Sequence, residues 1–122
     1  MEIKFLGANE HVTGSKHLLI GLTHNILIDC GLYQGIDAEK ENLNIEMILK
    51  DEKIDAIILT HGHLDHCGYI PKLYKDGFRG PIFCTAPTKE IANIILSDNA
   101  NIQSGNAIKH NKKIKKDSLK VK

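Results

Sequence analysis

The stretch from residue 55 to residue 66 constrains the fold most, because an apolar strand runs straight into a group of polar side chains. Residues 55–60 read Asp-Ala-Ile-Ile-Leu-Thr, a short apolar run typical of a buried β-strand. Residues 61–66 follow at once and read His-Gly-His-Leu-Asp-His. A chain of 122 residues forms one domain at most, so the strand and the polar group at its end belong to the same small fold.

The flanking segments predict an α/β fold. Besides 55–60, strands are expected over 3–6, 17–22, 26–29 and 81–85, and helices over 37–50, 67–76 and 88–101. The early strands follow one another as in a hairpin, whereas the later ones alternate with helices, which favours a mixed β-sheet with flanking helices. Strands that are apolar throughout need cover on both faces, and this chain supplies few elements to provide it. We therefore expect a fold that is only partly built.

Charge divides the sequence into a body and a tail. Residues 109–122 hold seven Lys against one Asp, a net charge of +6, and subtracting this from the total of +1 leaves −5 for residues 1–108. We expect residues 1–108 to form the domain and residues 109–122 to be a basic, disordered tail. The alternative is that the lysines follow a phosphate backbone. The sequence singles out no nucleic-acid-binding residue.

The cysteines and the amino terminus bear on location. Cys30, Cys67 and Cys84 form no CxxC pair, and three thiols beside a candidate metal site favour a reducing compartment. The first residues have no long apolar core of a signal peptide, and no apolar run approaches the length of a membrane span. We expect a cytoplasmic protein that does not enter the membrane.

Three imidazoles and one carboxylate within six residues are candidate metal ligands. His61 and His63 can project to the same side of an extended loop and bind one ion, and Asp65 and His66 can reach a second. These donors suit zinc, although manganese or iron would also fit. Two ions about 3.5–4 Å apart would turn a bound water into a nucleophile, so Asp65 and His66 are also candidate catalytic residues, with Asp65 either a ligand or a base. A purely structural role explains this density of polar groups poorly.

The cluster resembles the HxHxDH signature of the metallo-β-lactamase superfamily. The segments 5–8, 12–15, 29–32, 34–35 and 97–103 look like the β-CASP branch, the RNA-processing nucleases related to bacterial ribonuclease J and to the nuclease subunit of the eukaryotic cleavage and polyadenylation machinery. The resemblance covers residues 1 to 103. His11 and Lys16 depart from the pattern of that branch, where an acidic residue and Cys are common.

The resemblance implies part of an αββα sandwich, apparently truncated, with two zinc ions in a complete site and RNA as the substrate. It also implies that Asp29 steadies the ligand loop, where a carboxylate can accept an imidazole N–H and fix the tautomer. The alternative is that Asp29 only forms a turn before Gly31. The family's later ligands and its RNA-binding domain have no match here. We therefore expect the 122-residue chain alone to be weakly active or inactive, and to need a completing chain or a second copy.

These observations favour a metal-dependent hydrolase that cleaves RNA phosphodiesters, by exonucleolytic or endonucleolytic attack. Two alternatives stay open. One is a hydrolase of a thioester or another small ester, because a ligand loop that generates hydroxide does not select what is attacked. The other is a non-catalytic fragment that binds metal or RNA, which the incomplete ligand set supports.

Overall fold

The computed structural model describes the backbone of residues 1–8 and 12–120 and the side chains of these residues as far as 105. His11 and residues 121–122 lie outside the described residues. In chain order the elements are β1 (Glu2–Gly7), β2 (Lys16–Ile20), β3 (Asn25–Ile28), α1 (Ala38–Lys50), β4 (Ala56–Ile58), α2 (Leu64–Cys67), α3 (Ile70–Lys75), β5 (Ile82–Phe83) and α4 (Ala86–Lys120).

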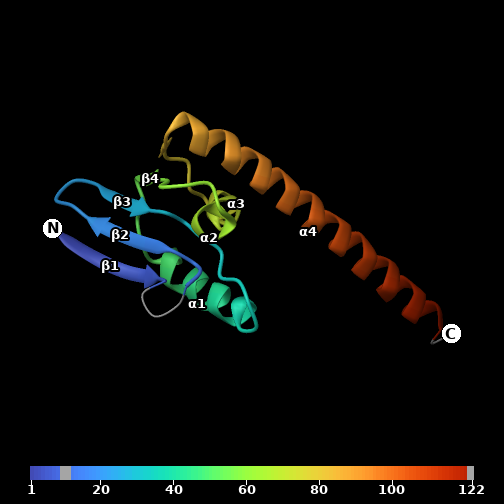
Figure 1. The fold of residues 1–122 in the computed structure, drawn as a ribbon. Coiled ribbons are helices and arrows are strands. Elements are labelled where there is room, and N and C mark those ends of the chain that lie inside the picture. The colour runs from blue at the N-terminus through green and yellow to red at the C-terminus, as the bar shows by residue number, and fades with distance from the viewer. Residues whose placement is uncertain (9–11, 121–122) are drawn as a thin grey trace.

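The five strands form one mixed sheet in the order β1-β2-β3-β4-β5, which confirms the predicted fold class. The first three strands are antiparallel neighbours, and a tight turn joins β2 to β3, closed by Gly21 N–H donating to the His24 carbonyl at 2.9 Å. The pairs β3–β4 and β4–β5 are parallel because helices lie between them in the chain. The sheet in Figure 1 therefore has an antiparallel half and a parallel half.

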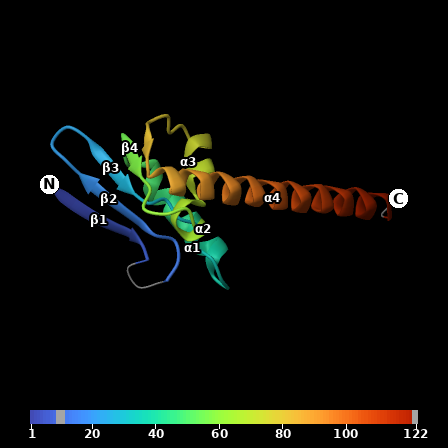
Figure 2. The same ribbon diagram turned by 45° about the horizontal axis from the view of Figure 1, so that its top comes forward.

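One face of the sheet is covered by helices and contains the core. Leu18, Leu27 and Ile57 lie on adjacent strands and are fully buried. Ile45 from α1 and Leu73 from α3 belong to the same buried cluster. Figures 1 and 2 show α1, α2 and α3 on the same side of the sheet. The alternation of buried and exposed side chains along the strands follows from this one-sided cover.

The opposite face of the sheet is apolar and open. The strand register aligns Phe5, His17, Ile28, Ile58 and Phe83 across all five strands on one face. Phe5 is 61% exposed and Phe83 is 58% exposed, which is unusual for large apolar side chains at matched sheet positions. Within the part of the chain that the structure describes, these side chains stay exposed, in line with the expectation of too few elements to cover both faces.

The helices differ in extent from the sequence prediction. The single helix expected over 67–76 is two, α2 and α3, and α2 begins at Leu64 inside the polar cluster. Helix α4 continues past the predicted end at residue 101 to Lys120, and Figures 1 and 2 show it extending away from the body. Disorder of residues 109–122 in solution stays a prediction. Among the described residues, no helix combines the length and apolar character needed to cross a bilayer.

Candidate metal centre

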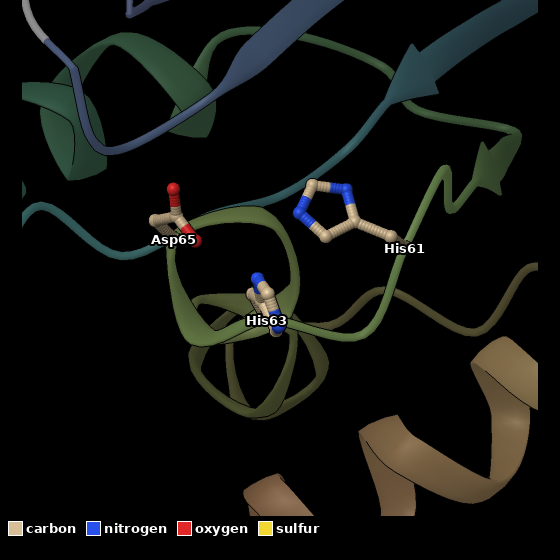
Figure 3. Close-up of side chains that lie close together, drawn as sticks. All are labelled: His61, His63 and Asp65. Carbon is tan, nitrogen blue, oxygen red and sulfur yellow. The ribbon is translucent and has the colours of Figure 1, made fainter.

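The polar cluster lies where the chain leaves the central strand β4 and enters α2. His61 and His63 occupy the connecting segment, and His63 has extended backbone angles (φ −70°, ψ 152°) as the residue that precedes α2. Asp65 lies in the first turn of α2. One ligand atom from each of these three residues lies within 4.8 Å of the other two. Figure 3 shows the three side chains turned toward a common space.

His66 adjoins this group from the same turn of α2. Its ring centroid lies 3.7 Å from that of His61, and its Nε2 lies 3.4 Å from Asp65 Oδ2. The structure thus brings all four predicted ligands together. It groups Asp65 with His61 and His63, whereas the sequence prediction paired Asp65 with His66. The difference arises because α2 begins at Leu64, and a helical turn directs the Asp65 side chain back toward the preceding residues.

Asp29 lies beneath the cluster, at the end of β3, and only 3% of it is exposed. One carboxylate oxygen accepts hydrogen bonds from the Thr60 hydroxyl at 2.7 Å and His66 Nδ1 at 2.8 Å, and the other accepts from Thr60 N–H at 2.8 Å. The backbone of Asp29 is left-handed, with φ 59°, a region that Asp tolerates better than most residues. Asp29 makes the contact with an imidazole expected of it, although its role in metal binding stays a prediction.

The hydrogen bond to Asp29 sets the tautomer of His66. An ionised carboxylate only accepts hydrogen bonds, so His66 Nδ1 must carry a proton. In the neutral ring Nε2 then presents a lone pair, and it faces an Asp65 oxygen at 3.4 Å. Two acceptors at this separation repel each other unless a proton or a metal cation lies with them. The donor set therefore fits a divalent cation by its chemistry as well as by its spacing.

The Thr60 hydroxyl sets the tautomer of His61 in a similar way. Its hydroxyl hydrogen is committed to Asp29, so the oxygen can only accept from His61 Nδ1, which lies 3.3 Å away. This orientation leaves His61 Nε2 as the lone pair. The sequence prediction missed Thr60; its place at the end of the apolar strand, directly before His61, is the signal that identifies it.

Backbone hydrogen bonds hold residues 61–66, the ligand turn that contains the candidate ligands, against the body. Ser15 N–H donates to the Asp65 carbonyl at 3.0 Å, and Cys30 N–H donates to the His66 carbonyl at 2.8 Å. A Cβ added to Gly31 would lie 1.6 Å from the Asp65 carbonyl oxygen, so only glycine permits this approach. The loops around residues 15 and 30 thus position the candidate ligands Asp65 and His66 through their main chains.

The thiols near the cluster are not arranged as ligands. Cys67 is fully buried, and its thiol donates to the Gly62 carbonyl at 3.4 Å. Burial, followed by the charges of Asp65 and Asp29, raises the pKa of the Cys67 thiol to about 11. Burial likewise raises the pKa of the Cys30 thiol to about 12. Both thiols are buried, and neither belongs to the group of His61, His63 and Asp65 whose ligand atoms converge, so they support the loop by packing.

Comparison with known proteins places this geometry in a family. Residues 24–116 match the family described as the β-lactamase superfamily domain. Ribonuclease TTHA0252 of Thermus thermophilus is 41% identical over 98 residues, which are 80% of this chain and 22% of that protein. The transcription termination factor FttA of Methanosarcina mazei is 36% identical over 115 residues, covering 93% of this chain and 17% of the factor.

One further relative and one solved structure also match the chain. The Integrator complex subunit 11 homolog of Dictyostelium discoideum is 38% identical over 98 residues, 76% of this chain and 13% of that protein. A crystal structure of a new diphosphatase from the PhnP family has a TM-score of 0.50 and 22% identity, covering 70% of this chain and 33% of its own, and shows the fold alone. The chain thus spans about a fifth or less of these curated relatives. With three quarters of its residues matched and the expected cluster at the end of β4, the chain belongs to the β-lactamase superfamily.

Proposed function

We propose that this chain provides the first set of metal ligands in a hydrolase that cleaves phosphodiester bonds in RNA, as a member of the β-CASP branch. The observation that carries the proposal is the convergence of His61, His63 and Asp65 within 4.8 Å, with His66 beside them. The relatives, a ribonuclease and a transcription termination factor, favour RNA as the substrate class.

We assign zinc as the ion and two ions to the complete site. His61 and His63 would hold the first, and Asp65 and His66 the second, with Asp65 also within reach of the first pair. Nε2 is the available nitrogen on both His61 and His66, because their Nδ1 atoms are engaged by Thr60 and Asp29. Imidazole nitrogen with carboxylate oxygen is a common zinc ligand set.

The chemistry follows from what these side chains can do. Bound divalent ions would supply Lewis acidity, activating a water at neutral pH and stabilising charge on phosphate oxygens. Asp65 and His66 are the proposed catalytic residues: the Asp65 carboxylate can orient or accept a proton from that water. Asp29 holds His66 in the orientation and tautomer that the reaction needs.

The proposed site is completed by residues beyond these four. Catalytic zinc usually has three protein ligands and one position for water, so two ions need more donors than His61, His63, Asp65 and His66 supply. The open apolar face of the sheet supports the same conclusion, because a layer must cover it in the active protein. We propose that a further segment or a second chain supplies both, and that the 122-residue chain alone turns over weakly or not at all. The cytoplasm stays the expected location.

Zinc titration by calorimetry, followed by an RNA cleavage assay, tests this proposal. We expect the chain to bind zinc, the His63→Ala variant to bind it at least 10-fold more weakly, and the exposed His24→Ala variant to bind it normally. Cleavage should appear only when a segment carrying the missing ligands is added. Absence of zinc binding by the wild-type chain would refute the metal centre.

Substrate assays separate the remaining alternatives. Hydrolysis of a thioester without cleavage of single-stranded RNA would identify a hydrolase of thioesters or other small esters instead. Zinc binding that depends on His63, with no activity toward either substrate even after completion, would identify a non-catalytic metal-binding fragment.

A further inference from the structure

Lys16 is fully buried at the start of β2, which is rare for a lysine. Its Nζ donates to the Gly31 carbonyl and lies 3.5 Å from the Gly14 carbonyl oxygen. It also lies 4.9 Å from the ring centroid of Tyr33 and 5.0 Å from that of Tyr69. The ammonium group is thus held by two aromatic faces and two carbonyls, and the proposed metal chemistry does not use it.

The carbonyls that accept from Lys16 belong to segments joined to the ligand turn. Gly31 N–H donates to the Ser15 carbonyl at 3.0 Å, and Ser15 N–H donates to the Asp65 carbonyl at 3.0 Å. Gly31 and Asp65 are in direct backbone contact, as the 1.6 Å approach of a Cβ built on Gly31 shows. A shift of the Gly31 carbonyl is therefore transmitted to the main chain of a proposed ligand.

We propose that Lys16 is a positioning residue for the metal centre, whose ammonium group holds the Gly14 and Gly31 carbonyls at the spacing that places Asp65. The inference rests on the proposed metal-binding function. Lys16 acts through these two carbonyls and through Ser15, and contacts no proposed ligand itself. It would bind neither the metal nor the substrate.

The energetics of burial separate this role from a general structural one. A buried charge opposes folding, and burial lowers the pKa of Lys16 to about 8. An apolar side chain of similar length would fill the same space between Tyr33 and Tyr69 without that cost. Lys16→Met removes that cost but also removes the donor to the Gly14 and Gly31 carbonyls, so we expect it to stay folded near neutral pH while the Gly31 and Asp65 segments loosen.

The test compares cobalt binding with stability in the 122-residue chain. Co²⁺ is titrated into the wild type and Lys16→Met, and its visible absorption reports affinity and coordination geometry. We expect Lys16→Met to bind Co²⁺ about 10-fold or more weakly, with altered absorption bands, while it still unfolds cooperatively in urea without metal. Lys40→Met, an exposed change on α1, is the matched control and should alter neither property. Cobalt affinity within twofold of wild type in folded Lys16→Met would overturn the proposal.

A second measurement needs no variant, so it decides the matter if Lys16→Met does not fold. The Lys16 ¹⁵Nζ signal and the backbone amide signals of Gly31 and Asp65 are followed by NMR as the pH is raised through about 8. We expect the amide signals to shift with the midpoint of the Lys16 signal. Amide signals that stay fixed while Nζ loses its proton would overturn the inference. Failure of the wild type to bind Co²⁺ would refute the metal function instead, and this NMR result would still stand.

Discussion

Replacing Asp29 with Asn should invert the tautomer of His66 and weaken metal binding without disturbing the backbone. Asn tolerates the left-handed conformation at φ 59° about as well as Asp, so the change isolates the carboxylate. The Asn oxygen can still accept from Thr60 N–H. Its NH₂ group then occupies the position of the second oxygen, where His66 Nδ1–H now donates at 2.8 Å. Two donors cannot face each other, so His66 Nδ1 must become the acceptor and Nε2 must take the proton.

The magnitude follows from the bonds that change. Charge-assisted hydrogen bonds from Thr60 and His66 become neutral ones, which should lower the unfolding free energy by about 1–3 kcal/mol. A metal can bind His66 Nε2 only if the proton returns to Nδ1, against the amide of the new Asn. We therefore expect zinc affinity to fall about 10–100-fold, equivalent to about 1.4–2.7 kcal/mol.

Long-range ¹H–¹⁵N NMR correlations distinguish the two His66 tautomers directly, and calorimetry measures zinc affinity. The wild type should show the proton on Nδ1, and Asp29→Asn should show it on Nε2. Asp51→Asn, an exposed change at the end of α1, controls for the loss of one negative charge. If His66 keeps its Nδ1 proton in Asp29→Asn, or if zinc affinity is unchanged, Asp29 does not control the imidazole as we argue.

Three further outcomes are expected. Thr60→Val removes the hydroxyl that contacts both Asp29 and His61, so it should lower the unfolding free energy by about 1 kcal/mol and weaken zinc binding severalfold in the same titration. An unaltered zinc affinity would argue against the orientation of His61 by Thr60. Gly31→Ala should cost about 2–3 kcal/mol in urea unfolding, because the added Cβ meets the Asp65 carbonyl, whereas Gly105→Ala should be neutral or stabilising because its Cβ meets nothing. Burial lowers the pKa of Lys16 to about 8 in the folded chain, against the smaller opposing effect of Cys30. Between about pH 8 and the ordinary value of 10.5 the unfolded chain therefore holds more protons, and the unfolding free energy of wild type minus that of Lys16→Met should rise across this window by about 1–3 kcal/mol; a flat or falling difference would contradict the assignment.

The strands and the grouping of the candidate ligands could be predicted because their signals are local. An apolar run before His61 marks a strand, and the spacing of four potential ligands needs no tertiary information. The mixed sheet also followed from the order of the elements. The start of α2 at Leu64 was missed because one helical turn shows no periodicity, and that turn decides how Asp65 is grouped with the histidines.

Contacts that depend on the tertiary fold could not be predicted in the same way. Lys16 is charged and precedes a strand, a pattern that indicates an exposed residue, yet it is fully buried. Only the approach of Gly31, Tyr33 and Tyr69 explains its place, and these residues are distant in sequence. The contact of His66 with Asp29 was expected because a family resemblance indicated it; the residues alone also allowed a simple turn.

The open sheet face lies next to the proposed metal centre. Ile58 ends β4 on the open face, and His61 follows only three residues later. A second layer that packs across Ile28, Ile58 and Phe83 therefore reaches the strand ends where His61 lies. Burying these apolar side chains would also exclude water from one side of the metal centre, which strengthens its electrostatic interactions. We therefore expect the missing ligands and the missing sheet cover to come from one and the same segment.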